Sequence, residues 1–88
     1  VLRLLGNTKT EEEWWVREAV AKNPNTPVDV LHTLGNQRTE SVWGVRRSVT
    51  ENPSTPEDVL RFLVNKKTES DGDVRKAAQK ALADRGLA

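Results

Sequence analysis

Apolar positions recur along the chain with helical spacing, and they fall into two kinds of set. The longer kind follows an i, i+3, i+4 pattern and comprises Val16, Ala19 and Val20, then Val45, Ser48 and Val49. The shorter kind comprises Val30, Leu31 and Leu34, then Val59, Leu60 and Leu63. Because this spacing places side chains on one face of an α-helix, the pattern predicts longer helices alternating with short helices of about two turns.

Polar residues and prolines predict where these helices begin and end. Thr39 or Ser41 is expected to cap the helix around Val45, since a capping side chain accepts a bond from an unpaired backbone N–H. Asn23-Pro24 is expected to end the preceding longer helix, because a residue before proline avoids helical angles. Thr26 is expected to cap the short helix that follows, with Pro27 at its first position.

The end of the chain departs from this pattern. Gly35 is expected to stop a short helix in the left-handed conformation. The segment 77–85 has no proline and contains strong helix formers, so it predicts one continuous helix, closed by Gly86. Polar residues on this last helix would suit the outer face of a terminal unit, and we expect a natural end of the array here; they are Lys80, Asp84 and Arg85.

The whole pattern repeats every 29 residues. Val16-Arg17 returns as Val45-Arg46 and Val74-Arg75, and Asn23–Pro27 returns as Asn52–Pro56. Such a period is typical of a solenoid, in which one unit cannot bury its apolar face alone. We therefore predict an all-α fold, a curved right-handed α-solenoid of three helix-turn-helix repeats.

The 88 residues are expected to form a single helical-repeat domain. Its units are approximately 1–7 (partial), 8–36, 37–65 and 66–88, the last acting as the C-terminal cap. The chain starts inside a motif, since Val1–Gly6 matches Val30–Gly35. We expect it to be a fragment of a longer array.

Composition narrows the chemistry. The net charge is +1, from 14 basic and 13 acidic residues, which demands neither nucleic acid nor an anionic membrane as a partner. Cysteine is absent, which excludes disulfides and thiolate chemistry and is compatible with a cytoplasmic, reducing compartment. No apolar run approaches the roughly 18 to 20 residues of a membrane span.

The string Val-Arg-x-Ala-Val-Ala-x-Asn-Pro-x-Thr-Pro-x-x-x-Leu-x-x-Leu, at residues 16–34, resembles the leucine-rich repeat variant family of bacterial helical arrays, which are related to HEAT repeats. The resemblance implies longer α-helices alternating with short α or 3-10 helices, and no β-sheet. The unit here is a few residues longer than the family pattern. The iron–sulfur module described in the family depends on cysteines, so no cofactor is expected here. The resemblance implies no reaction either, since function depends on sites rather than folds.

A row of arginines stands at the repeat spacing: Arg17, Arg46 and Arg75. It could be a ridge that binds anions or nucleic acid, or an internal ladder in which each guanidinium bonds carbonyls or carboxylates of the same or next unit. We favour the ladder, with Asp29 and Asp58 as plausible partners. Arg47 and Lys76 are better candidates for a surface patch, because Glu18 stands at their position in the first unit.

The connectors carry two further rows of charge. Lys9, Arg38 and Lys67 form a basic row, and Glu11, Glu40 and Glu69 form an acidic row two residues on. The two rows are expected to form a solvated, charge-paired edge.

Trp14 and Trp43 occupy the same repeat position, where the third unit has Gly72. Counted from Val16, this position lies on the far side of the helix from the apolar face. Two interpretations are open, an exposed contact surface for a partner or packing between repeats, and we favour packing because the chain has few large apolar residues. Trp15 lies nearer the apolar face and is expected in the core.

No catalytic set stands out. His32 is the only histidine, without metal-ligand spacing, and the serines lack a base and an orienting group. We therefore predict a protein that is not an enzyme and needs neither cofactor nor metal. The leading hypothesis is a scaffold for protein–protein interaction. The alternative is nucleic-acid binding. The candidate partner-binding residues are Trp14, Trp43, Arg46, Arg47, Arg75 and Lys76.

Overall fold

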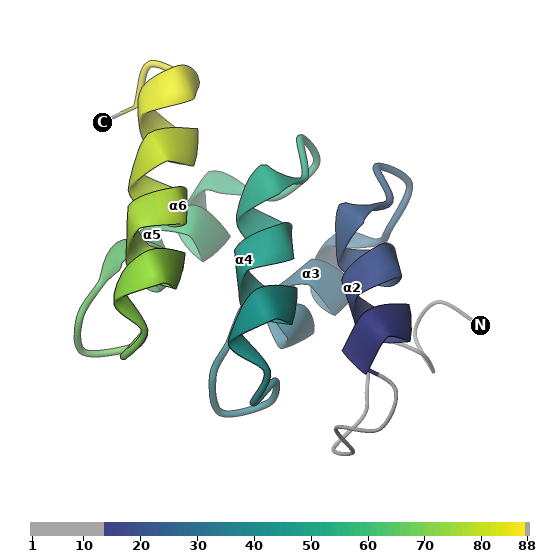
Figure 1. The fold of residues 1–88 in the computed structure, drawn as a ribbon. Helices are drawn as coiled ribbons and strands as arrows, with labels where there is room; N and C mark the ends of the chain where they lie inside the picture. Colours follow the sequence, from purple (N-terminus) through teal and green to yellow (C-terminus); the bar gives the residue numbers. More distant parts are fainter. Residues whose placement is uncertain (1–13, 88) are drawn as a thin grey trace.

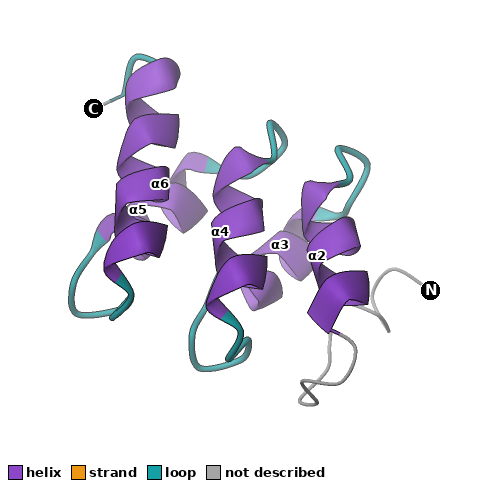
Figure 2. Cartoon of the chain, viewed as in Figure 1, coloured by secondary structure: helices purple, strands orange, loops and turns teal. Residues whose placement is uncertain are grey.

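The computed structural model describes residues 14–87, and within them the chain is entirely helical, with five helices and no strand (Figure 2). The elements are α2 (Trp14–Lys22), α3 (Val28–Leu34), α4 (Trp43–Glu51), α5 (Glu57–Val64) and α6 (Gly72–Asp84). The predicted alternation of longer and short helices is confirmed, since α3 has 7 residues and α5 has 8. The partial first unit predicted at residues 1–7 lies outside the described residues.

The helices form two rows (Figure 1). One row holds α2, α4 and α6 side by side, and α3 and α5 lie behind it. Each short helix therefore covers the gap between consecutive long helices. As predicted, α6 is a single continuous helix of 13 residues, and Gly86 follows it with a positive φ of 73°.

The core lies between the two rows, and each helix contributes a few side chains to it. It consists of Val20, Ala21, Val30, Leu31, Leu34, Val45, Val49, Val59, Leu60, Leu63, Val74, Ala78 and Leu82. Both predicted apolar sets of the short helices are buried, and so is the predicted set of α4. Valine and leucine dominate, so the core is built without any large aromatic side chain.

The predicted apolar face of α2 is wrong by one residue. The buried residues are Arg17, Val20 and Ala21, while Ala19 is exposed and Val16 is only partly buried. Arg17 is buried because its guanidinium bonds Glu40 in the connector before α4. Trp15, expected in the core, is 56% exposed and lies on the same exposed side of α2 as Ala19, four residues on.

The predicted helix caps of α3 and α4 are also wrong. The residues at the N-caps of α3 and α4 are Pro27 and Val42, and neither makes a side-chain cap bond. Thr26 instead donates its hydroxyl to the Val20 carbonyl at 2.6 Å, which satisfies the end of the preceding helix. Asp71 caps α6, since its side chain accepts the N–H groups of Asp73 and Val74.

Gly35 does not adopt the left-handed conformation, since its φ is −97°. Its role is steric. A Cβ at this position would lie 2.8 Å from Cγ1 of Val59 and 3.0 Å from the Leu31 carbonyl oxygen. The residue must be small because the end of α3 meets α5 here.

Candidate functional site

Two buried arginine–glutamate pairs connect consecutive units of the chain. Arg17 donates from Nε to Oε1 of Glu40 at 2.6 Å and from Nη2 to Oε2 at 2.9 Å. Arg46 repeats both bonds with Glu69 at 2.6 and 2.8 Å. In each pair the side chains are at most 5% exposed. We call these four residues the Arg–Glu ladder.

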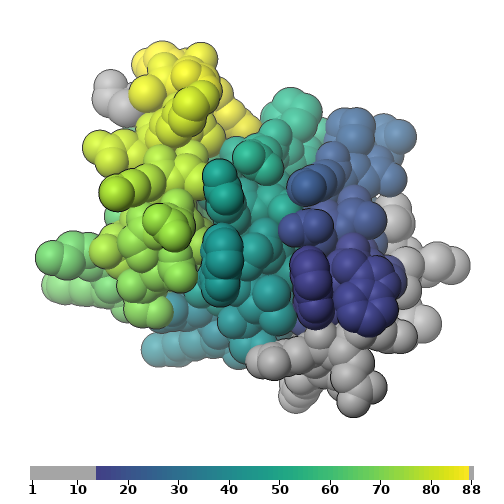
Figure 3. All heavy atoms as spheres, viewed as in Figure 1, coloured from purple at the N-terminus to yellow at the C-terminus, as the bar shows by residue number. Residues whose placement is uncertain are grey.

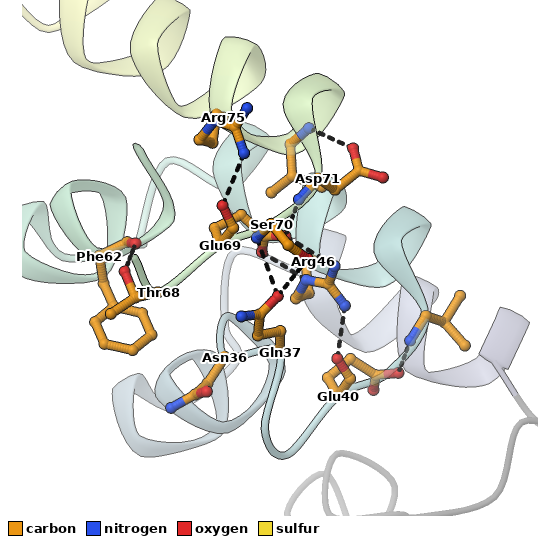
Figure 4. Close-up of polar contacts among 12 residues, drawn as sticks. Asn36, Gln37, Glu40, Arg46, Phe62, Thr68, Glu69, Ser70, Asp71 and Arg75 are labelled. Atoms are coloured by element: carbon orange, nitrogen blue, oxygen red, sulfur yellow. Dashed lines mark hydrogen bonds and ion pairs between the residues drawn. The ribbon is translucent and has the colours of Figure 1, made fainter. Parts of the chain in front are cut away.

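The glutamates of the ladder also organise the connector that carries them (Figure 4). Oε2 of Glu40 accepts the Val42 N–H at 3.1 Å, and the Glu40 carbonyl accepts a bond from Nη1 of Arg46 at 2.8 Å. Oε2 of Glu69 accepts the Asp71 N–H in the same way at 3.0 Å. Each carboxylate therefore bonds the backbone N–H of the residue directly before α4 or α6 as well as its arginine.

The ladder confirms the internal interpretation of the arginine row but corrects its partners. Asp58 lies 3.5 Å from His32 instead of near an arginine, and Asp29 is exposed. The partners are glutamates from the connectors. The constant spacing of 23 residues from each arginine to its glutamate was the signal that could have found them.

The prediction of a solvated, charge-paired edge along the connectors is therefore wrong. Glu40 and Glu69 lie in the interior at 1% and 0% exposure, while Arg38 and Lys67 remain at the surface. Burial of the glutamates costs desolvation, which the buried arginines offset through bidentate bonds. The corresponding Lys9 and Glu11 lie outside the described residues.

The two repeat-row arginines named as partner-binding candidates differ in accessibility. Arg46 is 4% exposed and fully engaged by the ladder, so its assignment to a partner-binding surface is corrected. Arg75 is only partly buried, and it donates from Nη1 to the Glu69 carbonyl at 2.9 Å. Arg75 therefore stays a candidate.

A groove of about 750 Å³ lies between α4 and α6, and the two other basic candidates, Arg47 and Lys76, both line it. Figure 3 shows the row of long helices, with α4 in teal and α6 in yellow-green. Acidic residues that we did not predict share the groove: Glu51, Asp73 and Asp84. The groove therefore carries charges of both signs.

Arg85 also lines this groove, although the sequence predicted it only as a polar residue on the outer face. It donates from Nη1 to the Thr55 carbonyl at 2.6 Å and from Nη2 to the Asn52 carbonyl at 3.1 Å. In the unit before, Asn52 makes the comparable link, donating its amide to the Ala21 and Asn23 carbonyls. Ala81 stands at the repeat position of Asn52, so Arg85 takes over a contact that the alanine cannot make.

The tryptophans lie at the surface of the long-helix row. Trp14 is 41% exposed and Trp43 is 48% exposed, so both rings lie at the surface and neither is buried between repeats. Trp15 joins them, with its ring edge-on to Trp14 at a centroid distance of 5.9 Å. Large aromatic side chains that remain this exposed are available for contact with another molecule.

The described residues offer little else for chemistry. Within residues 14–87, no three histidine, aspartate or glutamate side chains come together in a way that could hold a metal ion. In the same segment, every helix is too short or too polar to cross a membrane.

One segment of the chain matches a known protein family. Residues 14–38, which contain α2 and α3, match the family model described as leucine rich repeat variant. This segment is similar to that family over the length of one repeat. No curated protein and no solved structure matches the chain.

The contacts of the leucine rich repeat variant segment recur beyond its limits. Thr55 donates to the Val49 carbonyl at 2.6 Å, as Thr26 does to Val20 within the segment. The side chain of Asn65 accepts the N–H two residues on at 2.9 Å, as that of Asn36 does. Local structure therefore follows the same rules in residues 39–71 as in the matched segment.

Proposed function

We propose that the chain is a non-catalytic scaffold that binds another protein through the long-helix row. The observation that carries the proposal is the exposure of Trp14, Trp15 and Trp43, each above 40%. The core contains none of these three rings, so packing of the core does not account for them. Exposed tryptophans are enriched among residues that dominate the energy of protein interfaces.

We further propose that the two rows of helices are part of a right-handed α-solenoid with 29-residue units. The recurrence of the Arg–Glu ladder and of the threonine contacts at this spacing supports the proposal. Solenoids present extended surfaces whose exposed residues are little constrained by folding. The family resemblance supports a bacterial source, and a chain without cysteine is compatible with the cytoplasm.

The binding face combines the tryptophans with the groove between α4 and α6. Trp43 and Arg47 are four residues apart on α4, so they lie on the same side of that helix. Arg47 lines the groove, and Trp43 lies one helical turn before it. Gly72 stands at the position equivalent to Trp43 on α6 and has no side chain. A partner that inserts an apolar side chain beside Trp43 and presents charges of both signs to the groove fits this face.

The experiment compares binding before and after removal of the tryptophans. Partners captured from the native host are identified, and their affinity for the purified chain is measured with the wild type and with Trp14→Ala/Trp43→Ala. We expect binding at least about 30-fold weaker in the double variant, as for hot-spot residues. Val28→Ala is the matched control, because Val28 is equally exposed at 49% but belongs to the short-helix row.

Circular dichroism establishes that both variants keep their helical content. Unchanged affinity of the folded double variant for every captured protein would show that the tryptophans are not the binding face. Equal weakening by Val28→Ala would show that exposed apolar surface in general is responsible.

Nucleic-acid binding is the second candidate, supported by the presence of Arg47, Lys76 and Lys80 in one groove. Three acidic residues in the same groove oppose it, and Arg46 does not reach the surface. True phosphate contacts would give an affinity that falls steeply with salt concentration. Absence of binding to single- or double-stranded oligonucleotides at low salt would exclude this candidate.

A further inference from the structure

Arg75, the third arginine of the repeat row, makes the same carbonyl bond as Arg46, but no carboxylate of the described residues binds the rest of its guanidinium. Arg46 uses Nη1 for the Glu40 carbonyl, and Nε and Nη2 for the carboxylate of Glu69. Arg75 uses Nη1 in the same way, for the Glu69 carbonyl. Within residues 14–87 its Nε and Nη2 make no hydrogen bond, and no ion pair involves Arg75. Figure 4 shows Arg75 beside Glu69 in this arrangement.

The open edge of Arg75 is held in place before any ligand arrives. The neighbouring residue Val74 is fully buried and anchors the backbone of Arg75. At the other end of the side chain, Nη1 is fixed by its bond to the Glu69 carbonyl. The side chain is partly buried, so its charge is less hydrated than that of a surface lysine. A guanidinium fixed in this way loses little rotamer entropy when a carboxylate binds its free edge in bidentate geometry.

We propose that Arg75 is a binding site for the glutamate carboxylate of an extended acidic segment in a partner protein. This inference rests on the proposed function, since it assigns one contact of the scaffold with its partner. The support is the continuity of the Arg–Glu ladder: the same guanidinium edge carries a glutamate at Arg17 and at Arg46. An arginine fork matches a planar carboxylate in bidentate geometry, and a glutamate carboxylate is what this edge holds at both equivalent positions.

The bound glutamates also define the shape of the segment. In both cases the carboxylate accepts the backbone N–H two residues further on, from Val42 at 3.1 Å and from Asp71 at 3.0 Å. A segment bound at Arg75 in the same way needs a free N–H at that position, which excludes proline.

A second contact defines the residue directly after the glutamate. In the ladder, Ser70 follows Glu69 and donates its N–H and hydroxyl to Oε1 of Gln37 at 3.0 and 2.8 Å. One repeat further on, Lys66 occupies the position of Gln37 and is exposed. An ammonium donates and cannot accept, so the residue after the glutamate is expected to be an acceptor, with the charged aspartate or glutamate preferred over serine.

The test follows the Nε–H resonances of the arginines by NMR during titration with a synthetic peptide. The probe is the acetylated, amidated peptide Lys-Thr-Glu-Asp-Val, and its control is Lys-Thr-Gln-Asp-Val. We expect the Arg75 resonance to shift saturably with the first peptide and the Arg46 resonance to stay in place. The glutamine peptide should bind about tenfold more weakly, because it loses the charge-assisted bidentate bonds.

Two variants separate the fork from simple charge. Arg75→Lys keeps the charge but should weaken the glutamate peptide about tenfold, while Arg38→Gln, which removes a surface charge one unit away, should leave the affinity unchanged. Lys66→Gln should abolish the preference for aspartate over serine after the glutamate. An unperturbed Arg46 resonance shows in each variant that the ladder is intact.

Two results would overturn the proposal. One is an Arg75 resonance that does not move at millimolar peptide, and the other is an equal response to sodium acetate, which would exclude recognition of a segment. The scaffold proposal is judged separately, because Trp14→Ala/Trp43→Ala should bind the peptide as the wild type does. Loss of partner binding in that variant, together with a silent Arg75, would sustain the scaffold and reject only this site.

Discussion

Removing one member of a buried pair from the Arg–Glu ladder should strongly destabilise the fold. Arg46→Met leaves the Glu69 carboxylate at 0% exposure without the two bonds of 2.6 and 2.8 Å that compensate its charge. It also removes the bond to the Glu40 carbonyl. Breaking a buried ion pair by removing one partner costs about 3 to 5 kcal/mol, most of it from the charge that remains.

The double variant Arg46→Met/Glu69→Met tests this reasoning. It removes both charges and fills the space with apolar atoms of similar volume. We expect it to be more stable than Arg46→Met by about 2 kcal/mol, because the unpaired charge is gone. Recovery should be incomplete, since the Asp71 N–H also loses its acceptor. Arg61→Met is the matched control: its pair with Glu57 is about half exposed on both sides, so the change should cost less than about 1 kcal/mol.

The assay is urea denaturation followed by helical circular dichroism. A domain of 88 residues is expected to have a total stability of about 4 to 13 kcal/mol, so Arg46→Met should lose a large share of it and unfold at a clearly lower urea concentration. A single variant within 1 kcal/mol of the wild type would refute the argument that burial makes the pair costly to break. So would a double variant that shows only the sum of the two single effects.

Three further predictions concern the framework of the fold, each measured as a change in the free energy of unfolding by urea titration. Thr55→Val should cost about 1 kcal/mol, because it removes the buried hydroxyl donor to the end of α4; no change would show that water replaces this bond without loss. Gly35→Ala should cost about 1 to 3 kcal/mol, since its Cβ would lie 2.8 Å from Val59, whereas Gly44→Ala should stabilise by about 0.5 kcal/mol in open helix surface. Effects of the same sign at the two glycines would contradict the steric account. Asp71→Ala should cost about 1 kcal/mol through loss of the α6 cap, and an unchanged stability would show that Asp71 does not act as one.

Most of the helical framework could be predicted because it depends on local rules. The apolar sets of the short helices, the stop at Asn23-Pro24 and the continuous α6 follow from side-chain spacing, proline and the glycine at residue 86. These features need no knowledge of what lies beside the helix. The 29-residue period then makes each local decision recur.

The errors came where a polar residue does the work of an apolar one. Arg17 occupies the buried face of α2, and a hydrophobicity pattern cannot count an arginine toward the core. The predicted face of α2 therefore left Arg17 out, as that of α4 left out Arg46, although the apolar set predicted for α4 is buried. Glu40 was assigned to a solvated edge for the same reason, because a carboxylate is almost never buried unless a partner from another unit reaches it.

The caps were misassigned because side-chain oxygens have more than one use. Thr26 is a good N-cap by residue type, but its hydroxyl donates backward to the preceding helix. Only the path of the turn decides between these bonds. The candidate site was predicted best where the repeats differ: Trp14, Trp43, Arg47 and Lys76 are all at the surface, whereas Arg46, chosen because it recurs, is buried.

Hydrogen exchange of the arginine Nε–H groups tests the Arg–Glu ladder most directly. Arg17 and Arg46, buried and bidentate, should exchange far more slowly than Arg47 at the surface, and Arg75 should fall between them. This order follows from the carboxylates that engage the first two and from the open edge of the third. Exchange of Arg46 at the rate of Arg47 would contradict the ladder, and protection of Arg75 equal to that of Arg46 would contradict its open edge.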